Sequence, residues 1–384
     1  MKFEFATATQ IIFGPGTLKQ VGPLAAEMGN NKALVVTSSA IRAKPLFDAL
    51  AAHGLDAVTF TITGEPTVEV VQQGTQQARA EKCDLVIGFG GGSALDTGKA
   101  IAILLTNPGD PLDYLEVIGL GKQLTQPAVP CIAIPTTAGT GAEVTRNAVL
   151  GSPEHRVKVS LRSPFMLPRL ALVDPELTYS LPPAVTASTG LDALTQSLEP
   201  FVSNKANPLT DALSREGMRR AARSLRRAYE HGHDVTARED MALASLCGGL
   251  ALANAKLGAV HGFASVLGGM FPAPHGVICA ALLPHVMDIN VQALRERQPD
   301  SEALRRYDEV AQILTGNPKA TANDGVAWVQ ELGQALQVPS LATYRLTLDD
   351  FPTVIQKTAV ASSTQGNPIK LTAEDMGEIL LRAL

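Results

Sequence analysis

Cysteine and aromatic residues are scarce in this sequence. Aromatic side chains make up 4% of the 384 residues, and the four cysteines are Cys83, Cys131, Cys247 and Cys279. No two of them have the spacing of a zinc ribbon or a redox pair, so a disulfide scaffold is not expected. Cys83, Cys131 and Cys279 have apolar neighbours along the chain, and we interpret them as buried thiols. This cysteine usage fits a reducing, cytoplasmic compartment.

Long apolar runs and a strong charge of one sign are also lacking. No run approaches the roughly 18 apolar residues of a spanning helix, and the first ten residues lack the apolar core of a signal peptide. The 32 basic and 37 acidic residues leave a net charge of −5, which gives no indication of a nucleic-acid partner. With 45% hydrophobic residues, the chain is expected to be globular, with two or three domains and no membrane partner.

The pattern of the chain changes near Pro182-Pro183. Before this point, short Val- and Ile-rich runs alternate with amphipathic stretches, which is typical of β-α units around a parallel sheet. The apolar runs are Ala33–Thr37, Ala57–Thr61, Asp84–Gly88, Cys131–Pro135 and Leu170–Asp174. After it, long Ala-, Leu- and Arg-rich segments predict helices and almost no strands. We predict an α/β dinucleotide-binding domain with a mostly parallel sheet over residues 1–181, and an all-α helical domain over residues 182–384.

A glycine-rich segment, Gly88-Phe-Gly-Gly-Gly-Ser93, lies between a predicted strand and a predicted helix. Glycine lets a backbone approach a pyrophosphate closely, and the unpaired N–H groups at a helix N-terminus attract anions. The spacing matches neither G-x-G-x-x-G nor the Walker pattern, so the segment alone fits a phosphate cradle and a plain tight turn equally well. As a cradle, it would contact the cofactor through Gly91, Gly92 and Ser93.

A second polar loop, within Ile134–Thr145, follows another apolar run. Its hydroxyl-bearing candidates for cofactor binding are Thr136, Thr137, Thr140 and Thr145. Threonine hydroxyls can bind sugar and phosphate oxygens, but they also cap loops ahead of helices. Both polar loops leave the carboxyl ends of predicted parallel strands, where open α/β sheets bind ligands. One dinucleotide is therefore expected to contact both loops.

Candidate metal ligands lie in the predicted helical half. Asp192 and Gln196 are four residues apart and share one helix face. His261 lies in an apolar segment, and His275 lies in a turn framed by proline and glycine. Each histidine alone also fits a bland role, as a hydrogen-bonded core residue or a turn residue. A carboxylate and two histidines in surroundings of low charge together favour a metal site.

In this order, the motifs resemble those of the iron-containing, or group III, alcohol dehydrogenases. The resemblance covers nearly the whole chain and includes the segments GGGSALDTGKA, IPTTAGTGAEVT, GLDALT, LGAVHGFA and FPAPHG. It implies an N-terminal dinucleotide-binding domain and a helical C-terminal domain. It also implies an enzyme that oxidises primary alcohols or reduces aldehydes with NAD(H) or NADP(H).

The resemblance also implies a metal held by an aspartate, a histidine four residues later, and two further histidines fourteen residues apart. Asp192, His261 and His275 match these positions, whereas Gln196 stands where the family has a histidine. An amide oxygen is a harder and weaker ligand than imidazole, so we expect affinity to fall by roughly 10–100-fold. We predict one divalent ion on Asp192, Gln196, His261 and His275: Fe²⁺ by resemblance, with Zn²⁺ and Mn²⁺ as alternatives.

Cofactor choice is predicted from Ser38. The resemblance implies an aspartate here in NAD-preferring members, where its charge would repel a 2′-phosphate. The neutral Ser38 therefore favours NADP(H), with NAD(H) tolerated. By resemblance, Lys158 lies near the cofactor, although it also fits a solvated lysine in a polar stretch, and Thr145 lies near the ribose or nicotinamide.

These observations predict a metal-dependent alcohol dehydrogenase or aldehyde reductase for a small uncharged substrate. The resemblance implies a homodimer or a larger homo-oligomer. One alternative is a sibling of the same fold, such as a glycerol dehydrogenase or a dehydroquinate-synthase-like enzyme. Gln196 motivates another alternative, a nucleotide-binding protein with an impaired metal site and a non-catalytic role.

Overall fold

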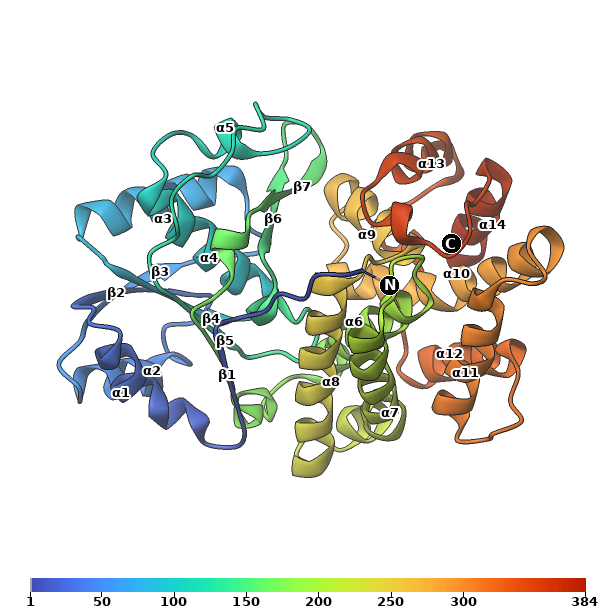
Figure 1. Cartoon of the computed structure of the whole chain (residues 1–384), viewed down its shortest axis with the longest axis horizontal. Helices are drawn as coiled ribbons and strands as arrows, with labels where there is room; N and C mark the ends of the chain where they lie inside the picture. Colours follow the sequence, from blue (N-terminus) through green and yellow to red (C-terminus); the bar gives the residue numbers. More distant parts are fainter. Residues whose placement is uncertain (1) are drawn as a thin grey trace. The chain divides into compact units, whose positions relative to one another are not determined.

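The computed structural model describes residues 2–384, which form two compact units. Residues Ala6–Thr137 and Gly141–Thr178 form an α/β unit, and Tyr179–Leu384 form a helical unit (Figure 1). The helical unit also includes the segment up to Phe5 and the short segment Ala138–Thr140. The predicted fold class, an α/β region followed by a helical region, is confirmed.

Within the described residues, a six-stranded parallel sheet forms the centre of the α/β unit. Its strand order is β1-β8-β5-β4-β2-β3. The strands are β1 (Gln10–Phe13), β2 (Lys32–Thr37), β3 (Asp56–Thr61), β4 (Leu85–Gly90), β5 (Cys131–Pro135) and β8 (Leu170–Val173). All except β1 coincide with the predicted apolar runs to within two residues. Gly90 is paired with Pro135, so the chain leaves β4 and β5 at the same edge of the sheet.

Helices cover both faces of this sheet because successive side chains of a strand point to opposite faces. Val35 and Ile87 pack with α1 and α2 in one core, while Leu34 and Val86 pack with α3 and α4 in the other. The helices of this unit are α1 (Val21–Glu27), α2 (Lys44–Ala51), α3 (Val68–Ala80), α4 (Gly92–Thr106) and α5 (Pro111–Tyr114).

The second polar loop, within Ile134–Thr145, is called the threonine loop below, and an antiparallel hairpin follows it. A 3₁₀ turn at Ala142–Val144 is followed by β6 (Asn147–Ser152) and β7 (Val157–Arg162), which form a separate two-stranded sheet. The apolar runs do not predict this hairpin, because only alternate residues of each strand join the core. The alternative interpretation of the threonines, as caps ahead of a helix, finds only the 3₁₀ turn, and Lys158 lies on strand β7.

The helical unit consists of α6 (Pro183–Val202), α7 (Pro208–Glu230), α8 (Val235–Asn254), α9 (Ala259–Met270), α10 (His275–Arg297), α11 (Glu302–Thr315), α12 (Ala322–Ala335), α13 (Phe351–Val360) and α14 (Ala373–Ala383). Helices α6, α7 and α8 pack side by side (Figure 1). On α6, Leu191, Leu194 and Leu198 join the hydrophobic core. This orientation leaves Asp192 and Gln196 on a different face of the same helix.

Helix α10 is more apolar than expected, since no run of the sequence was predicted to approach the length of a spanning helix. By length and composition alone, it could cross a membrane, but 72% of its most apolar window is buried within the structure. Helices α8 and α9 satisfy the same test only as a pair bent by 96°. The burial of α10 identifies it as a core helix.

Candidate functional site

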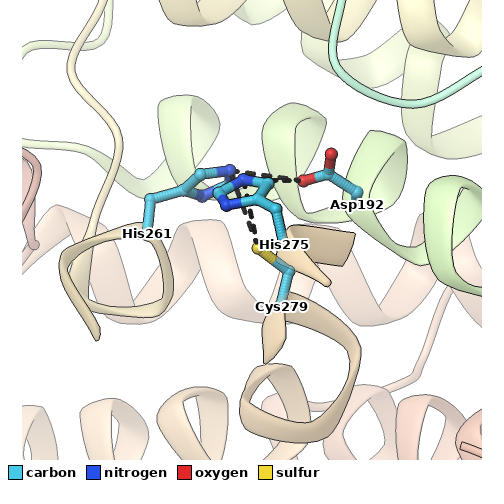
Figure 2. Close-up of side chains that lie close together, drawn as sticks. All are labelled: Asp192, His261, His275 and Cys279. Atoms are coloured by element: carbon cyan, nitrogen blue, oxygen red, sulfur yellow. Dashed lines mark hydrogen bonds and ion pairs between the residues drawn. The ribbon is translucent and has the colours of Figure 1, made fainter. Parts of the chain in front are cut away.

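The predicted metal ligands come from three helices of the helical unit. Asp192 lies on α6, His261 on α9 and His275 on α10. The Nε2 atoms of His261 and His275 lie 3.4 and 3.8 Å from Oδ1 of Asp192. Side chains far apart in the sequence therefore converge on one point (Figure 2).

His275 is the first residue of a helix. Pro274 occupies the N-cap of α10, with a φ of −59°. The turn predicted around His275 is thus the start of α10. Proline is well tolerated just before a helix, because the first N–H groups of a helix have no partner within it and the missing N–H of proline costs nothing there. Gly276 lets α10 approach α6 closely: a Cβ atom there would lie 2.6 Å from the carbonyl oxygen of Ser188. This close approach brings His275 towards Asp192.

Cys279 joins the group as a fourth donor. Its Sγ atom lies 3.9 Å from Nε2 of His261 and 3.7 Å from Nε2 of His275. The donor atoms of Asp192 and these three residues all lie within 4.8 Å of one another. Cys279 is fully buried, as the sequence analysis expects, but it faces polar side chains. Its spacing of one helical turn from His275 is the signal in the sequence that could have identified it.

Glu199 supports His261 from the opposite side of the ring and is absent from the sequence prediction. Its Oε2 atom lies 2.7 Å from Nδ1 of His261, and its Oε1 atom accepts the backbone N–H of Val260 at 2.7 Å. The carboxylate of Glu199 accepts the Nδ1–H of His261, which leaves Nε2 as the ring atom that faces Asp192. Glu199 follows Asp192 by seven residues on buried α6, so helical periodicity places both on one face.

Two buried oxygen atoms of this region have no hydrogen-bond partner among the described residues. They are Oδ1 of Asp192 and Oε1 of Gln196, whose residues are 1% and 3% exposed. A buried carboxylate oxygen without a partner is costly unless a cation is bound beside it. The cluster therefore fits a metal ion by its geometry and by the chemistry of its donors.

The electrostatics of the cluster also favour positive charge. Burial alone raises the pKa of Asp192, yet His275 and His261 hold that pKa below its usual value. Burial alone lowers the pKa of His261, yet Cys279 and Asp192 raise that pKa well above its usual value. The pKa of His275 is raised by the same two neighbours against the effect of burial. The carboxylate of Asp192 thus creates a negative potential that attracts a cation.

The two polar loops of the α/β unit lie side by side at the carboxyl edge of the sheet. The backbone N–H of Thr136 donates to the carbonyl oxygen of Gly90 at 2.8 Å. Gly91 precedes α4 and makes no side-chain cap, and a Cβ atom on it would lie 3.3 Å from Oγ1 of Thr137. The start of α4, at Gly92 and Ser93, is thus a helix N-terminus without a side-chain cap, which is the arrangement that binds phosphate groups.

Ser38 lies at the same edge of the sheet. It is exposed and follows β2, whose last residue, Thr37, pairs with Phe89 of β4. Its hydroxyl is therefore one strand away from the glycine segment. No charge of its own would repel a phosphate group there.

The remaining predicted cofactor residues have different surroundings. Thr145 is 4% exposed, and Nζ of Lys99 donates to its Oγ1 atom at 2.8 Å. Lys158 is not a solvated lysine: its side chain is 6% exposed, and its Nζ atom lies 2.7 Å from Oε2 of Glu65. Thr140 belongs to the short segment that joins the helical unit.

Comparison with known proteins gives matches along the whole chain. The family model described as "Iron-containing alcohol dehydrogenase" matches residues 8–175, and "Fe-containing alcohol dehydrogenase family, C-terminal" matches residues 186–384. A 1,3-propanediol dehydrogenase from Klebsiella pneumoniae is 35% identical over 99% of this chain and 98% of that protein. An NAD-dependent methanol dehydrogenase from Bacillus methanolicus is 32% identical over 97% of each chain. The crystal structure of a 1,3-propanediol oxidoreductase superposes with a TM-score of 0.92, at 34% identity and 100% coverage of both chains.

Proposed function

The chain belongs to the iron-containing alcohol dehydrogenase family, and we propose that it interconverts a small uncharged alcohol and its aldehyde with one divalent metal ion and NAD(H). Members of this family are oxidoreductases with alcohol dehydrogenase activity, and the enzyme class of this chain follows from that membership. The substrate itself is the part that we propose.

The observation that carries the proposal is the convergence of Asp192, His261 and His275. Two imidazole nitrogens lie 3.4 and 3.8 Å from one unpartnered carboxylate oxygen. Such a buried arrangement of oxygen and nitrogen donors is the kind that holds a catalytic metal. Asp192, His261 and His275 would hold the metal, which would supply Lewis-acid polarisation of the substrate oxygen, while a bound nicotinamide would supply the hydride chemistry.

The side chains of the site have separate tasks. Glu199 keeps the proton on Nδ1 of His261, so that Nε2 remains free to donate its lone pair. Asp192 supplies negative charge in a place where its side chain is 2% exposed, so water screens that charge little. The side chain of His275 is 32% exposed, and we propose that small molecules reach the cluster past this residue.

For the dinucleotide, we propose that its pyrophosphate binds at the start of α4. Gly91, Gly92 and Ser93 provide backbone there without a side-chain cap, and Thr136 and Thr137 line the neighbouring loop. Thr140 is proposed to contact the cofactor from the same loop.

Thr145 and Lys158 are proposed to act at the cofactor site chiefly by positioning other groups. The hydroxyl of Thr145 accepts a hydrogen bond from Lys99 and donates to the carbonyl of Ala142, which holds the threonine loop in shape. Lys158 is paired with Glu65, whose side chain is 47% exposed, so a phosphate group would compete with that carboxylate.

The preference for NADP(H) inferred from Ser38 finds no support among the relatives. The methanol dehydrogenase relative is named as NAD-dependent, and the family uses NAD(H). We therefore propose NAD(H) as the working cofactor. The exposed and uncharged Ser38 is proposed to leave NADP(H) acceptable as well.

A cytoplasmic location and a homodimeric or larger assembly complete the proposal. All four cysteines are free thiols in the structure, and each is buried. This is the usual state of cysteine in a reducing compartment.

Metal-dependent turnover tests the function. Metal-free protein is incubated with Zn²⁺, Mn²⁺ or Fe²⁺, and oxidation of NADH and of NADPH is followed with a panel of small aldehydes. We expect turnover that depends on the metal and is lost in His261→Ala but kept in His233→Ala, which alters an exposed histidine of a loop. If nucleotide binds but no metal supports reduction of any aldehyde, the non-catalytic alternative that Gln196 motivates replaces this proposal. Oxidation of glycerol with NAD⁺ tests the alternative of a glycerol dehydrogenase.

A further inference from the structure

We propose that Cys279 is a metal ligand in this protein and that its thiolate makes the site selective for zinc over iron. The inference rests on the proposed function in one respect, namely that a metal binds at Asp192, His261 and His275. It adds a fourth donor, one that the resemblance to the family does not imply.

Four of the six distances between the donor atoms of the cluster are close to those of a four-coordinate site. Ligands placed about 2.0–2.3 Å from a central zinc ion, at the corners of a tetrahedron, are separated by roughly 3.3–3.8 Å. The measured separations are 3.4 and 3.8 Å from Asp192 to the two histidines, and 3.9 and 3.7 Å from Cys279 to the same histidines. The other two separations, from Asp192 to Cys279 and between the two histidines, are at most 4.8 Å, so shifts of up to about one ångström would bring all four donor atoms to bonding distance of one ion.

The side chain of Cys279 points from α10 towards His261 and His275 (Figure 2). It is 0% exposed, one helical turn after His275, and its sulfur faces both Nε2 atoms. The unpartnered Oδ1 of Asp192 lies within 4.8 Å of this sulfur. A carboxylate oxygen, two imidazole nitrogens and a sulfur thus surround one point, and together they form the donor set of a four-coordinate metal site.

Charge and ligand softness both point to zinc. A carboxylate and a thiolate together balance the two positive charges of a divalent ion, which a buried site requires. Thiolate with imidazole is a typical donor combination for zinc, whereas the amide oxygen of Gln196 is a hard and weak donor. Binding breaks the S–H bond of Cys279, forms a sulfur–metal bond and releases the proton to solvent. The thiolate thus supplies the strong fourth donor that the amide of Gln196 cannot.

Cobalt substitution tests the proposal without reference to activity. Metal-free protein is titrated with Co²⁺, and the absorption spectrum is recorded for wild type, Cys279→Ser and Cys247→Ser. Cys247 is a matched control because it is also buried in the helical unit, on α8. We expect a thiolate-to-cobalt charge-transfer band in wild type and in Cys247→Ser, and none in Cys279→Ser. Absence of the band in wild type, or its persistence in Cys279→Ser, overturns the proposal, as does a failure of wild type to bind Co²⁺.

Zinc binding provides a second readout. Competition with a chelator should show zinc affinity reduced by at least tenfold in Cys279→Ser, with iron affinity changed less. If Cys279→Ser does not fold, X-ray absorption of zinc-loaded wild type decides: one sulfur at about 2.3 Å supports the proposal, and a shell of nitrogen and oxygen alone overturns it.

The two proposals fail in different ways. Metal-dependent aldehyde reduction without a sulfur signature leaves the proposed function standing and removes Cys279 from the ligand set. A sulfur-ligated metal in a protein that reduces no aldehyde confirms Cys279 as a ligand and removes the proposed function.

Discussion

Nδ1 of His261 lies 2.7 Å from Oε2 of Glu199, and the other oxygen of this carboxylate accepts the backbone N–H of Val260. Glu199 is thus surrounded by two donors and fixes both the ring of His261 and the first turn of α9. Gly258 makes this approach feasible, because a Cβ atom there would lie 2.8 Å from Oε1 of Glu199. The orientation of one imidazole of the cluster therefore depends on a residue of α6 that lies on the other side of its ring.

The first prediction concerns Glu199→Gln. The two oxygens of Glu199 accept one hydrogen bond each, from His261 and from Val260. The amide of glutamine has only one oxygen, so one of these two donors would face an NH₂ group instead. We expect metal affinity to fall by roughly 10–100-fold, because this partner orients a ligand. Competition against a chromophoric chelator measures the change. Glu331→Gln, at an exposed position, is the control, and equal affinities in the two variants would contradict the assignment of Glu199.

The second prediction concerns Gln196→His. Oε1 of Gln196 is buried without a partner, one turn from Asp192 on α6, and an imidazole there would add a nitrogen donor. We expect the affinity for Fe²⁺ to rise by roughly 10–100-fold, the reverse of the penalty for a lost ligand interaction. Gln292→His on the exposed side of α10 controls for nonspecific binding by an added histidine. A variant with unaltered iron affinity would mean that position 196 does not face the ion.

The third prediction concerns cofactor choice at Ser38. Ser38→Asp places a negative charge at the edge of the sheet where the adenosine ribose is proposed to bind. We expect kcat/KM for NADPH to fall at least tenfold, about 1.4 kcal/mol, relative to that for NADH. Ser38→Asn changes the side chain without the charge and should leave the ratio nearly unchanged. An NADPH to NADH ratio that is the same in wild type and Ser38→Asp would place the ribose elsewhere.

The fourth prediction uses two glycines within helices. Gly276→Ala puts a methyl group 2.6 Å from the backbone oxygen of Ser188, which cannot move away as a side-chain end can. We expect a loss of about 1–3 kcal/mol in the free energy of unfolding, together with weaker metal binding, because α10 carries His275. Gly333→Ala on α12 meets no atom within 4 Å, and we expect it to stabilise the protein by up to about 1 kcal/mol. Denaturant unfolding of both variants checks whether the signs are opposite.

The fifth prediction concerns Glu143, a buried residue of the 3₁₀ turn at Ala142–Val144. Burial raises the pKa of Glu143 to about 7, from its usual 4.5. Between pH 4.5 and pH 7, the carboxyl group of Glu143 holds its proton more tightly in the folded chain than in the unfolded chain. Its contribution to the free energy of unfolding is therefore fully present below about pH 4.5. As the pH rises towards 7, the free energy of unfolding falls by about 3 kcal/mol.

Unfolding measurements at pH 5 and pH 8 test this dependence. Glu143→Gln removes the titrating group, so its stability should fall less than that of wild type over this range. Glu154→Gln, on the exposed turn of the β6–β7 hairpin, should retain the wild-type pH dependence. Parallel pH profiles for wild type and Glu143→Gln would show that Glu143 is ionised in the folded protein.

Local patterns of the sequence predicted most of the fold. Buried parallel strands are nearly continuous apolar runs, so β2, β4, β5 and β8 are visible in the sequence, and β3 at the edge of the sheet is visible through its Val and Phe. The hairpin of β6 and β7 is not visible in this way, because half of its residues face away from the core. The start of α10 at His275 was obscured for a related reason: proline and glycine mark turns, yet Pro274 is an N-cap and Gly276 lies within the helix.

The sequence by itself predicted the family, the five apolar strands and the change to helices after them, and three of the four residues that converge. It did so because Asp192, His261 and His275 stand in motifs whose residue types and spacing are specific. Only the tertiary structure decided that Cys279 and Glu199 complete the cluster. Their roles depend on how closely α6, α9 and α10 approach one another, and such distances between remote segments leave no periodic trace in the chain.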